Sequence, residues 1–149
     1  MNVDELTLEQ LRVAIAERLG WRWMRRADDG LAMLVPPGAY QLRSTKDGKP
    51  WLVPSTAGAE RYKDWDTLIW TGAISEGLPN WPADIGAADA LLDDLESRSG
   101  HWELASLSGG GYQLAVIIDT PAEIRAFRAM GKTRSEAVCR AWLKATGAE

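Results

Sequence analysis

The clearest local pattern in the sequence is HWELASLSGGGYQLAVIID, residues 101–119. Two runs rich in apolar and aromatic residues, 101–107 and 112–119, flank a Ser-Gly-Gly-Gly loop at 108–111. Runs of this length, bounded by glycine, are typical of two strands that pair as a hairpin. The sequence therefore predicts an antiparallel β-hairpin at this position.

A helix is predicted immediately before the hairpin, at about 84–98. Ile85, Ala88, Leu92 and Leu95 recur there at helical spacing, and we expect them to form its buried face.

A second helix is predicted after the hairpin, at the C-terminal end. Thr133 has Glu136 three residues later, the spacing of a capping box, and Gly147 is the expected terminator. The expected apolar side of this helix consists of Ala137, Val138, Ala141, Trp142 and Ala145. Between hairpin and helix, 122–130 reads AEIRAFRAM and predicts one or two helical turns or a loop.

The N-terminal region predicts a helix at about 8–19. Thr7 and Gln10 have capping-box spacing, and Gly20 is a natural left-handed terminator. Its expected apolar stripe consists of Leu8, Leu11, Ile15 and Leu19.

Strand patterns follow this helix. Residues 21–26, WRWMRR, alternate with period two, and an Asp-Asp-Gly turn separates them from a second expected strand at 31–35. The segment at about 36–75 is an irregular insert, rich in Gly, Pro, Ser and charge. Its expected strands are a hairpin of 40–43 with 51–53, and a short strand at 67–71.

These elements predict an α+β fold, a layered alpha-beta-alpha domain with a mainly antiparallel sheet and three helices. The chain has 149 residues, 46% of them hydrophobic, which fits one domain over 1–149.

Four stretches together resemble the phage ABA sandwich domain family: LRVAIAERLGWRW, LPNWPADIGAADALLDDL, GGGYQLAVII and GKTRSEAVCRAWLKA. The resemblance implies an alpha-beta-alpha arrangement and a phage or prophage origin. The family has no established reaction or catalytic residues, so it transfers none to this chain. The insert lies outside the resemblance.

Composition excludes several classes of site. A single cysteine, Cys139, leaves no intramolecular disulfide framework, and with the single His101 it leaves no zinc site built on His and Cys. The acid pairs Asp64/Asp66 and Asp93/Asp94 lack further oxygen ligands at a recognisable spacing, so we expect no metal and no cofactor. The net charge of −4 argues against double-stranded nucleic acid as the main partner.

The N-terminus, MNVDELTLEQL, is acidic and has no apolar core typical of a secretory signal. The longest apolar runs are about five residues, against about 20 for a membrane span. We therefore expect no membrane partner and a cytoplasmic protein, located in the host cytoplasm if phage-encoded.

Gly131, Lys132 and Thr133 resemble the end of a phosphate-binding loop, but the position of its first glycine is Ala126. The sequence therefore argues against a nucleotide hydrolase. Lys132 and Arg134 still place cations at a helix N-terminus, where free N–H groups can bind an anion. The alternative is a simple cap with solvated neighbours.

Eight tryptophans are many for this length, and rings near arginines can stack on bases or anchor an interface. Packing in the core is the alternative for each. The candidate ligand-binding residues are Trp21, Arg22, Trp23, Arg25, Trp81, Lys132, Thr133 and Arg134. We assign no catalytic residue: His101 has no evident nucleophile beside it, and Cys139 is interpreted as a packing thiol.

The sequence thus favours a phage-type accessory protein that acts by binding rather than by catalysis. One ligand hypothesis is a small anionic, nucleotide-like signal of host defence, which the protein would sequester. The alternatives are an inhibitor or adaptor that binds a host protein, and a small hydrolase. A homo-oligomer is also left open.

Overall fold

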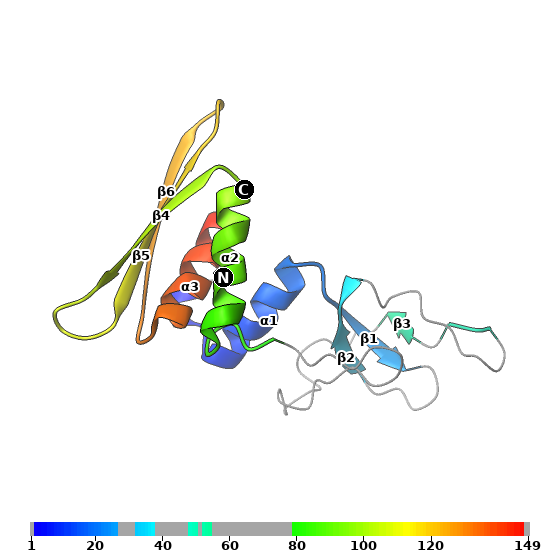
Figure 1. Ribbon diagram of the computed structural model, residues 1–149. Helices are drawn as coiled ribbons and strands as arrows, with labels where there is room; N and C mark the ends of the chain where they lie inside the picture. The colour runs from blue at the N-terminus through cyan, green and yellow to red at the C-terminus, as the bar shows by residue number, and fades with distance from the viewer. Residues whose placement is uncertain (1, 27–31, 38–47, 51, 55–78, 148–149) are drawn as a thin grey trace. The chain divides into compact units, whose positions relative to one another are not determined.

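The computed structural model describes residues 2–26, 32–37, 48–50, 52–54 and 79–147 (Figure 1). The chain divides into two compact units, one formed by Met1–Ile15 with Pro79–Glu149 and the other by Ala16–Leu78. The predicted insert lies inside the second unit, which interrupts the first in sequence. The prediction of one domain over 1–149 stays a prediction.

The first unit contains a three-stranded antiparallel sheet in the order β4-β5-β6. Its strands are β4 (Gly100–Ser106), β5 (Tyr112–Asp119) and β6 (Ile124–Gly131). The predicted hairpin is confirmed as β4 and β5, in which Trp102 lies opposite Val116 and Leu104 opposite Leu114.

Strand β6 corrects the sequence prediction for 122–130, which was one or two helical turns or a loop. The segment pairs with β5 along its whole length, from Ile124 opposite Asp119 to Gly131 opposite Tyr112. Phe127 and Ala129 lie opposite the buried Val116 and Leu114. Pairing with a buried strand outweighs the helix preference of this alanine- and arginine-rich segment, because strand preference depends strongly on context.

Helices α2 (Ile85–Ser97) and α3 (Arg134–Gly147) pack against each other and against the same side of this sheet (Figure 1). In α2, Ala88, Leu92 and Leu95 are buried as predicted. Ile85 is 61% exposed, so its predicted burial is wrong. Ile85 begins the helix, beyond the packed stripe, and Leu91 completes that stripe instead.

Helix α3 supplies the centre of the core. All its predicted apolar residues are buried: Ala137, Val138, Ala141, Trp142 and Ala145. The Trp142 indole nitrogen donates to the Asp94 carboxylate of α2 over 2.8 Å. A buried indole N–H needs such an acceptor, so Asp94 connects the two helices.

Helix α1 (Leu8–Arg18) follows a short 3₁₀ turn, Val3–Glu5. Its capping box is confirmed: the Thr7 N–H donates to Gln10 Oε1 (2.9 Å), and the Gln10 N–H donates to Thr7 Oγ1 (3.2 Å).

The predicted stripe of α1 is only partly buried. Leu11 and Ile15 are fully buried, whereas Leu8 and Leu19 at its two ends are 45% and 37% exposed. Gly20 has a φ of +95° and confirms the left-handed termination.

The second unit contains another antiparallel sheet, in the order β2-β1-β3. Its strands are β1 (Arg22–Arg26), β2 (Ala32–Val35) and β3 (Leu52–Pro54). The predicted pairing of the first two strands is confirmed. β3 pairs with the other edge of β1. The predicted strands at 40–43 and 67–71 lie outside the described residues.

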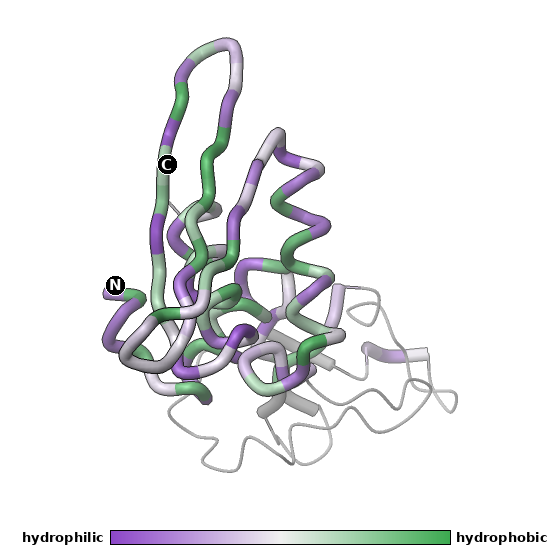
Figure 2. Tube along the Cα trace, turned by 60° about the vertical axis from the view of Figure 1, so that its left-hand side comes forward, coloured by the Kyte–Doolittle hydropathy of each residue, from purple (hydrophilic) through white to green (hydrophobic). Residues whose placement is uncertain are grey.

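The predicted α+β class is confirmed: the described residues form three α-helices and two antiparallel sheets. No described element of the first unit covers the side of β4–β6 opposite α2 and α3, so the unit has one helical layer on one sheet (Figure 1). Figure 2 shows a largely hydrophobic run along β5 and hydrophilic residues interspersed along β6 in the tall β5–β6 hairpin. The uncovered side is called the open face below.

Candidate binding surfaces

The start of α3 brings together three of the predicted ligand-binding residues: Lys132, Thr133 and Arg134. The Glu136 N–H donates to Thr133 Oγ1 over 3.1 Å, which confirms Thr133 as the N-cap. The Glu136 carboxylate accepts in return from the Lys132 N–H over 2.9 Å. The chain's own carboxylate therefore already occupies part of the place where an anion would bind at this helix start.

Further contacts hold Glu136 in its charged form. Burial opposes ionisation, but hydrogen bonds from the Arg140 side chain and the Lys132 N–H, with the charges of both residues, outweigh it and lower the pKa of Glu136. Arg140 is itself buried, pairs with Glu136 over 2.8 Å and donates to the Val3 carbonyl over 2.6 Å. The ion pair lies within α3, and the hydrogen bond from Arg140 to Val3 joins α3 to the N-terminal turn.

Two cationic side chains remain exposed at the same corner, those of Lys132 and Arg134. The Arg134 guanidinium lies over the Tyr112 ring, 5.5 Å from its centre. A Cβ on Gly131 would come within 2.5 Å of the Ala137 nitrogen, so strand and helix approach as closely as glycine allows. The corner offers cations beside an aromatic ring, as an anionic ligand would need.

The candidates in the second unit form a separate group. Trp21 and Trp23 are half-buried and Arg22 is exposed, while the Arg25 side chain lies outside the described residues. Partial burial raises the pKa of Glu17, and a hydrogen bond with Trp23 acts against that shift. Trp23 thus takes part in the packing of its own unit.

Trp81 corrects the candidate list. Its ring is only 5% exposed, so it is a core residue and presents no face to a ligand. It follows Asn80, whose carbonyl accepts from the N–H groups of Ala83 and Asp84 in the turn that leads into α2. Trp81 closes that turn against the interior.

The lone thiol and the lone histidine lie in different surroundings. Cys139 is buried in α3, and that burial raises the pKa of its thiol, which agrees with a packing residue. His101 is exposed on β4. Within the described ranges, no three His, Cys, Asp or Glu side chains are grouped so as to hold a metal ion.

The Gly131–Thr133 motif does follow a strand, contrary to the expectation for 122–130. The motif is still not a phosphate loop, because Ala126, at the position of the first glycine, lies inside β6. The chain is paired with β5 as far as Gly131 and enters α3 at Arg134, which leaves no loop to enclose a phosphate.

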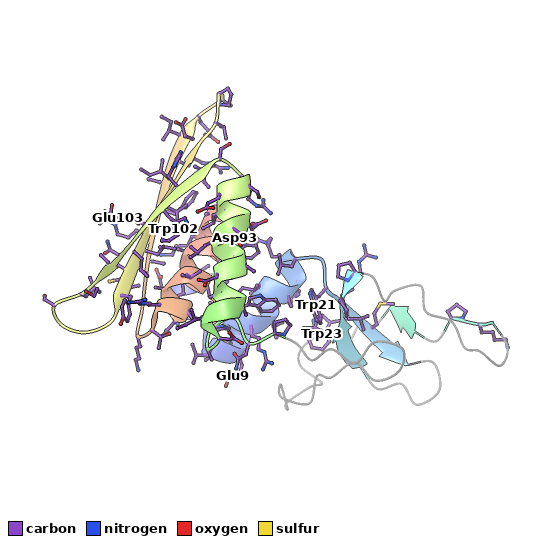
Figure 3. All side chains as sticks on the ribbon, in the orientation of Figure 1. Glu9, Trp21, Trp23, Asp93, Trp102 and Glu103 are labelled. Carbon is purple, nitrogen blue, oxygen red and sulfur yellow. The ribbon has the colours of Figure 1, made fainter. Side chains whose placement is uncertain are left out.

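The open face combines exposed apolar side chains with small ones. Ile117, Ile124 and Met130 are 46%, 70% and 59% exposed. Strand alternation and register assign the remaining residues of the open face: His101, Glu103, Ala105, Gln113, Ala115, Asp119, Ala126 and Arg128. Figure 3 shows the alternation on β4, where Trp102 points toward the helices and Glu103 points away from them.

The open face carries charged side chains on all three strands: Glu103 on β4, Asp119 at the end of β5 and Arg128 on β6. Glu103 of β4 and Arg128 of β6 are both opposite Ala115 of the central strand. Both side chains are exposed, and in the part of the chain that the structure describes neither makes an ion pair or a side-chain hydrogen bond. This row therefore has a negative charge at its β4 edge and a positive charge at its β6 edge.

No family model, curated protein or solved structure matches this chain. The resemblance to the phage ABA sandwich domain family therefore stays a prediction. Among the described residues, no helix is long and apolar enough to cross a membrane.

The sequence reasoning missed the open face because it did not recognise β6. Residues 124–130 gave only a weak local signal, because the two alternating sets, Ile124/Ala126/Arg128/Met130 and Arg125/Phe127/Ala129, each contain one arginine among apolar residues. As a strand, this pattern places Arg128 and Met130 on one side and Phe127 on the other.

Proposed function

We propose that this protein acts by binding another protein through the open face of the β4–β5–β6 sheet. The observation that carries the proposal is the exposure of Ile117, Ile124 and Met130 on one sheet face that no described element of their unit covers. Ile117 and Ile124 lie in adjacent rows, and Met130 lies beyond the row of Glu103 and Arg128. Exposed apolar side chains among polar ones are typical of interaction sites.

Small residues make this face suitable for close contact. Ala105, Ala115 and Ala126 lie between the larger side chains, one on each strand. A second protein layer can therefore approach to the usual separation of stacked sheets, about 10 Å. The small residues of this face, together with the family resemblance, support the interpretation that the protein is a phage-type accessory protein. It would act as an inhibitor or adaptor by binding a partner.

A photo-crosslinking amino acid tests this proposal when it replaces Ile117 in protein expressed in bacterial cells. The matched control replaces Asp93, which is exposed on α2 away from the open face (Figure 3). We expect crosslinks to a second polypeptide from position 117 and not from position 93. Equal yields from the two positions, or crosslinks only within the same chain, would overturn the proposal.

A second candidate function is the binding of a small anionic, nucleotide-like ligand at the start of α3. The observation that favours it is the exposed pair Lys132 and Arg134, with Arg134 held over Tyr112 at 5.5 Å. The Glu136 carboxylate acts against it, because it already accepts the Lys132 N–H.

Thermal unfolding with a panel of mono-, di- and cyclic nucleotides tests this candidate, because a ligand of the native state raises the unfolding temperature. We expect a shift for one nucleotide, absent in Lys132→Glu/Arg134→Glu and kept in the control Lys49→Glu, at an exposed cation outside both surfaces. An unchanged unfolding temperature across the panel would reject it.

A further inference from the structure

We propose that the open face binds a second copy of this chain, related to the first by a two-fold axis parallel to the strands. The inference rests on the proposed function, because it uses the same surface and names the occupant. It is carried by the register of the three strands and by where the charges fall.

Three rows with a member on every strand cross the open face, beside a fourth pair, Asp119 and Ile124, on β5 and β6 alone. The central row holds Glu103, Ala115 and Arg128, in the order β4, β5, β6. The rows on its two sides hold His101, Ile117 and Ala126, and Ala105, Gln113 and Met130. Each row thus has one member on each strand, with β5 in the middle.

A two-fold axis along β5 exchanges the outer strands between the copies. When the second copy stacks face to face, its β4 lies over β6 of the first, and its β6 lies over β4. Residues of one row stay at the same height along the strands. Each row of one copy therefore lies over the same row of the other copy, with its β4 residue over the β6 residue and its β6 residue over the β4 residue.

This reversal brings opposite charges together. Glu103 of each copy faces Arg128 of the other, which gives two equivalent ion pairs on either side of a contact between the two Ala115 residues. The arrangement is isologous, as a two-fold interface requires. Neither side chain has to leave another ion pair within the described residues in order to form it.

The reversal also places large side chains over small ones. In the neighbouring rows, Met130 faces Ala105 of the second copy, and His101 faces Ala126. The Ile117 side chains of the two copies meet at the centre. Large residues thus enter the space left by alanines, which is how two sheet faces interdigitate at about 10 Å.

The other in-plane axis, perpendicular to the strands through the central row, does not fit. It would place β4 over β4 and β6 over β6, with Glu103 on Glu103 and Arg128 on Arg128. Like charges facing each other across an interface are unfavourable. The axis parallel to the strands gives two ion pairs in this row, against one like-charge contact between the two Asp119 residues at the end of β5. The charge pattern therefore favours that axis.

The size of the face predicts a reversible dimer. Three strands about 4.8 Å apart, with seven paired positions at about 3.4 Å each, cover about 14 Å by 24 Å. Standard interfaces bury about 800 Å² per partner, and smaller ones belong to transient complexes. We expect dissociation in the micromolar range.

Sedimentation velocity over a series of protein concentrations tests the proposal. We expect the wild-type protein to change from monomer to dimer across the micromolar range. Glu103→Arg alone and Arg128→Glu alone should each weaken dimerisation at least tenfold, because either variant turns both ion pairs into repulsions. The double variant, Glu103→Arg with Arg128→Glu, should restore it, because both pairs re-form in reverse.

Glu9→Arg is the matched control, because it makes the same change of charge on α1 (Figure 3) and should leave dimerisation unchanged. A wild-type protein that stays monomeric would overturn self-association, while crosslinks from position 117 to a different protein would leave the proposed function standing. A dimer unaffected by the single reversals, or not restored by the double variant, would overturn this geometry.

Discussion

The two faces of the β4–β5–β6 sheet differ in what covers them, although the same three strands build both. On the covered face, Leu114 and Val116 of β5 are fully buried under the helices. On the open face, their neighbour Ile117 is 46% exposed. A strand buried on one side only normally alternates apolar with polar. β5 carries an apolar residue, Ile117, on the open side as well, and the proposed interface would cover it.

The polar groups differ in the same way. On the covered side, the indole N–H groups of Trp142 and Trp102 donate to Asp94 and Glu96 of α2, over 2.8 Å and 3.1 Å. On the open side, Glu103 and Arg128 have no such side-chain partners within the described ranges. The covered face is satisfied by its own unit, whereas the open face leaves charges available to a second molecule.

Removing the largest buried ring should have the largest effect on stability. Trp142→Ala empties a fully buried site and leaves Asp94 without the indole donor, so we expect a loss of about 3–5 kcal/mol in the free energy of unfolding. Trp102→Ala, at a ring 38% exposed, should lose about 1 kcal/mol. Urea denaturation measures both, and equal losses would contradict the assignment of Trp142 as the core residue.

Truncating one residue on each face compares the faces directly. Leu114→Ala should lower the free energy of unfolding by about 2–5 kcal/mol, because the side chain is fully buried. Ile117→Ala should change it by less than about 1 kcal/mol in the monomer, measured by urea denaturation at low protein concentration. A large loss at Ile117 would show that the chain itself covers the open face.

The junction of β6 with α3 should tolerate no side chain at Gly131. A Cβ there would lie 2.5 Å from the Ala137 nitrogen and 2.8 Å from the Glu136 Cβ, so we expect Gly131→Ala to cost about 1–3 kcal/mol. Gly109→Ala is the control, because its Cβ would meet nothing within 4 Å. Thermal unfolding of the two variants should rank them in that order, and an equally stable Gly131→Ala would contradict the close approach.

The smallest expected effect is the pH dependence that Glu136 contributes. Because its pKa in the folded protein is lowered from 4.5, its ionised form stabilises the fold above that value, and this stabilisation is lost as the pH falls through the folded pKa. The wild-type protein should therefore be more stable than Glu136→Gln at neutral pH, and the difference should shrink in acid. Urea denaturation across this range would contradict the account if the difference stayed constant.

The sequence predicted the elements whose signals are local. Thr7 and Gln10 form the expected capping box, Gly20 ends α1 in the left-handed conformation, and Trp142 is buried on the expected side of α3. These features depend on hydrogen bonds and side-chain spacing within a few residues. Local sequence is enough to define them.

The sequence did not predict features that depend on distant neighbours. Residues 124–130 contain alanines and arginines that favour a helix, and only pairing with β5 makes them a strand. Missing β6 also concealed the Glu103–Arg128 row, because the two residues share a row only through Ala115 between them. Trp81 was assigned to a ligand for the same reason: its burial depends on the tertiary fold.

One measurement tests the open face as an interaction surface most directly: sedimentation velocity of an equimolar mixture of Glu103→Arg and Arg128→Glu. Each variant alone repels itself in the proposed dimer, but the mixture forms two matched ion pairs between unlike copies. We predict that the mixture forms a dimer at concentrations where each variant alone is monomeric. A mixture that stays as monomeric as its components would contradict the account.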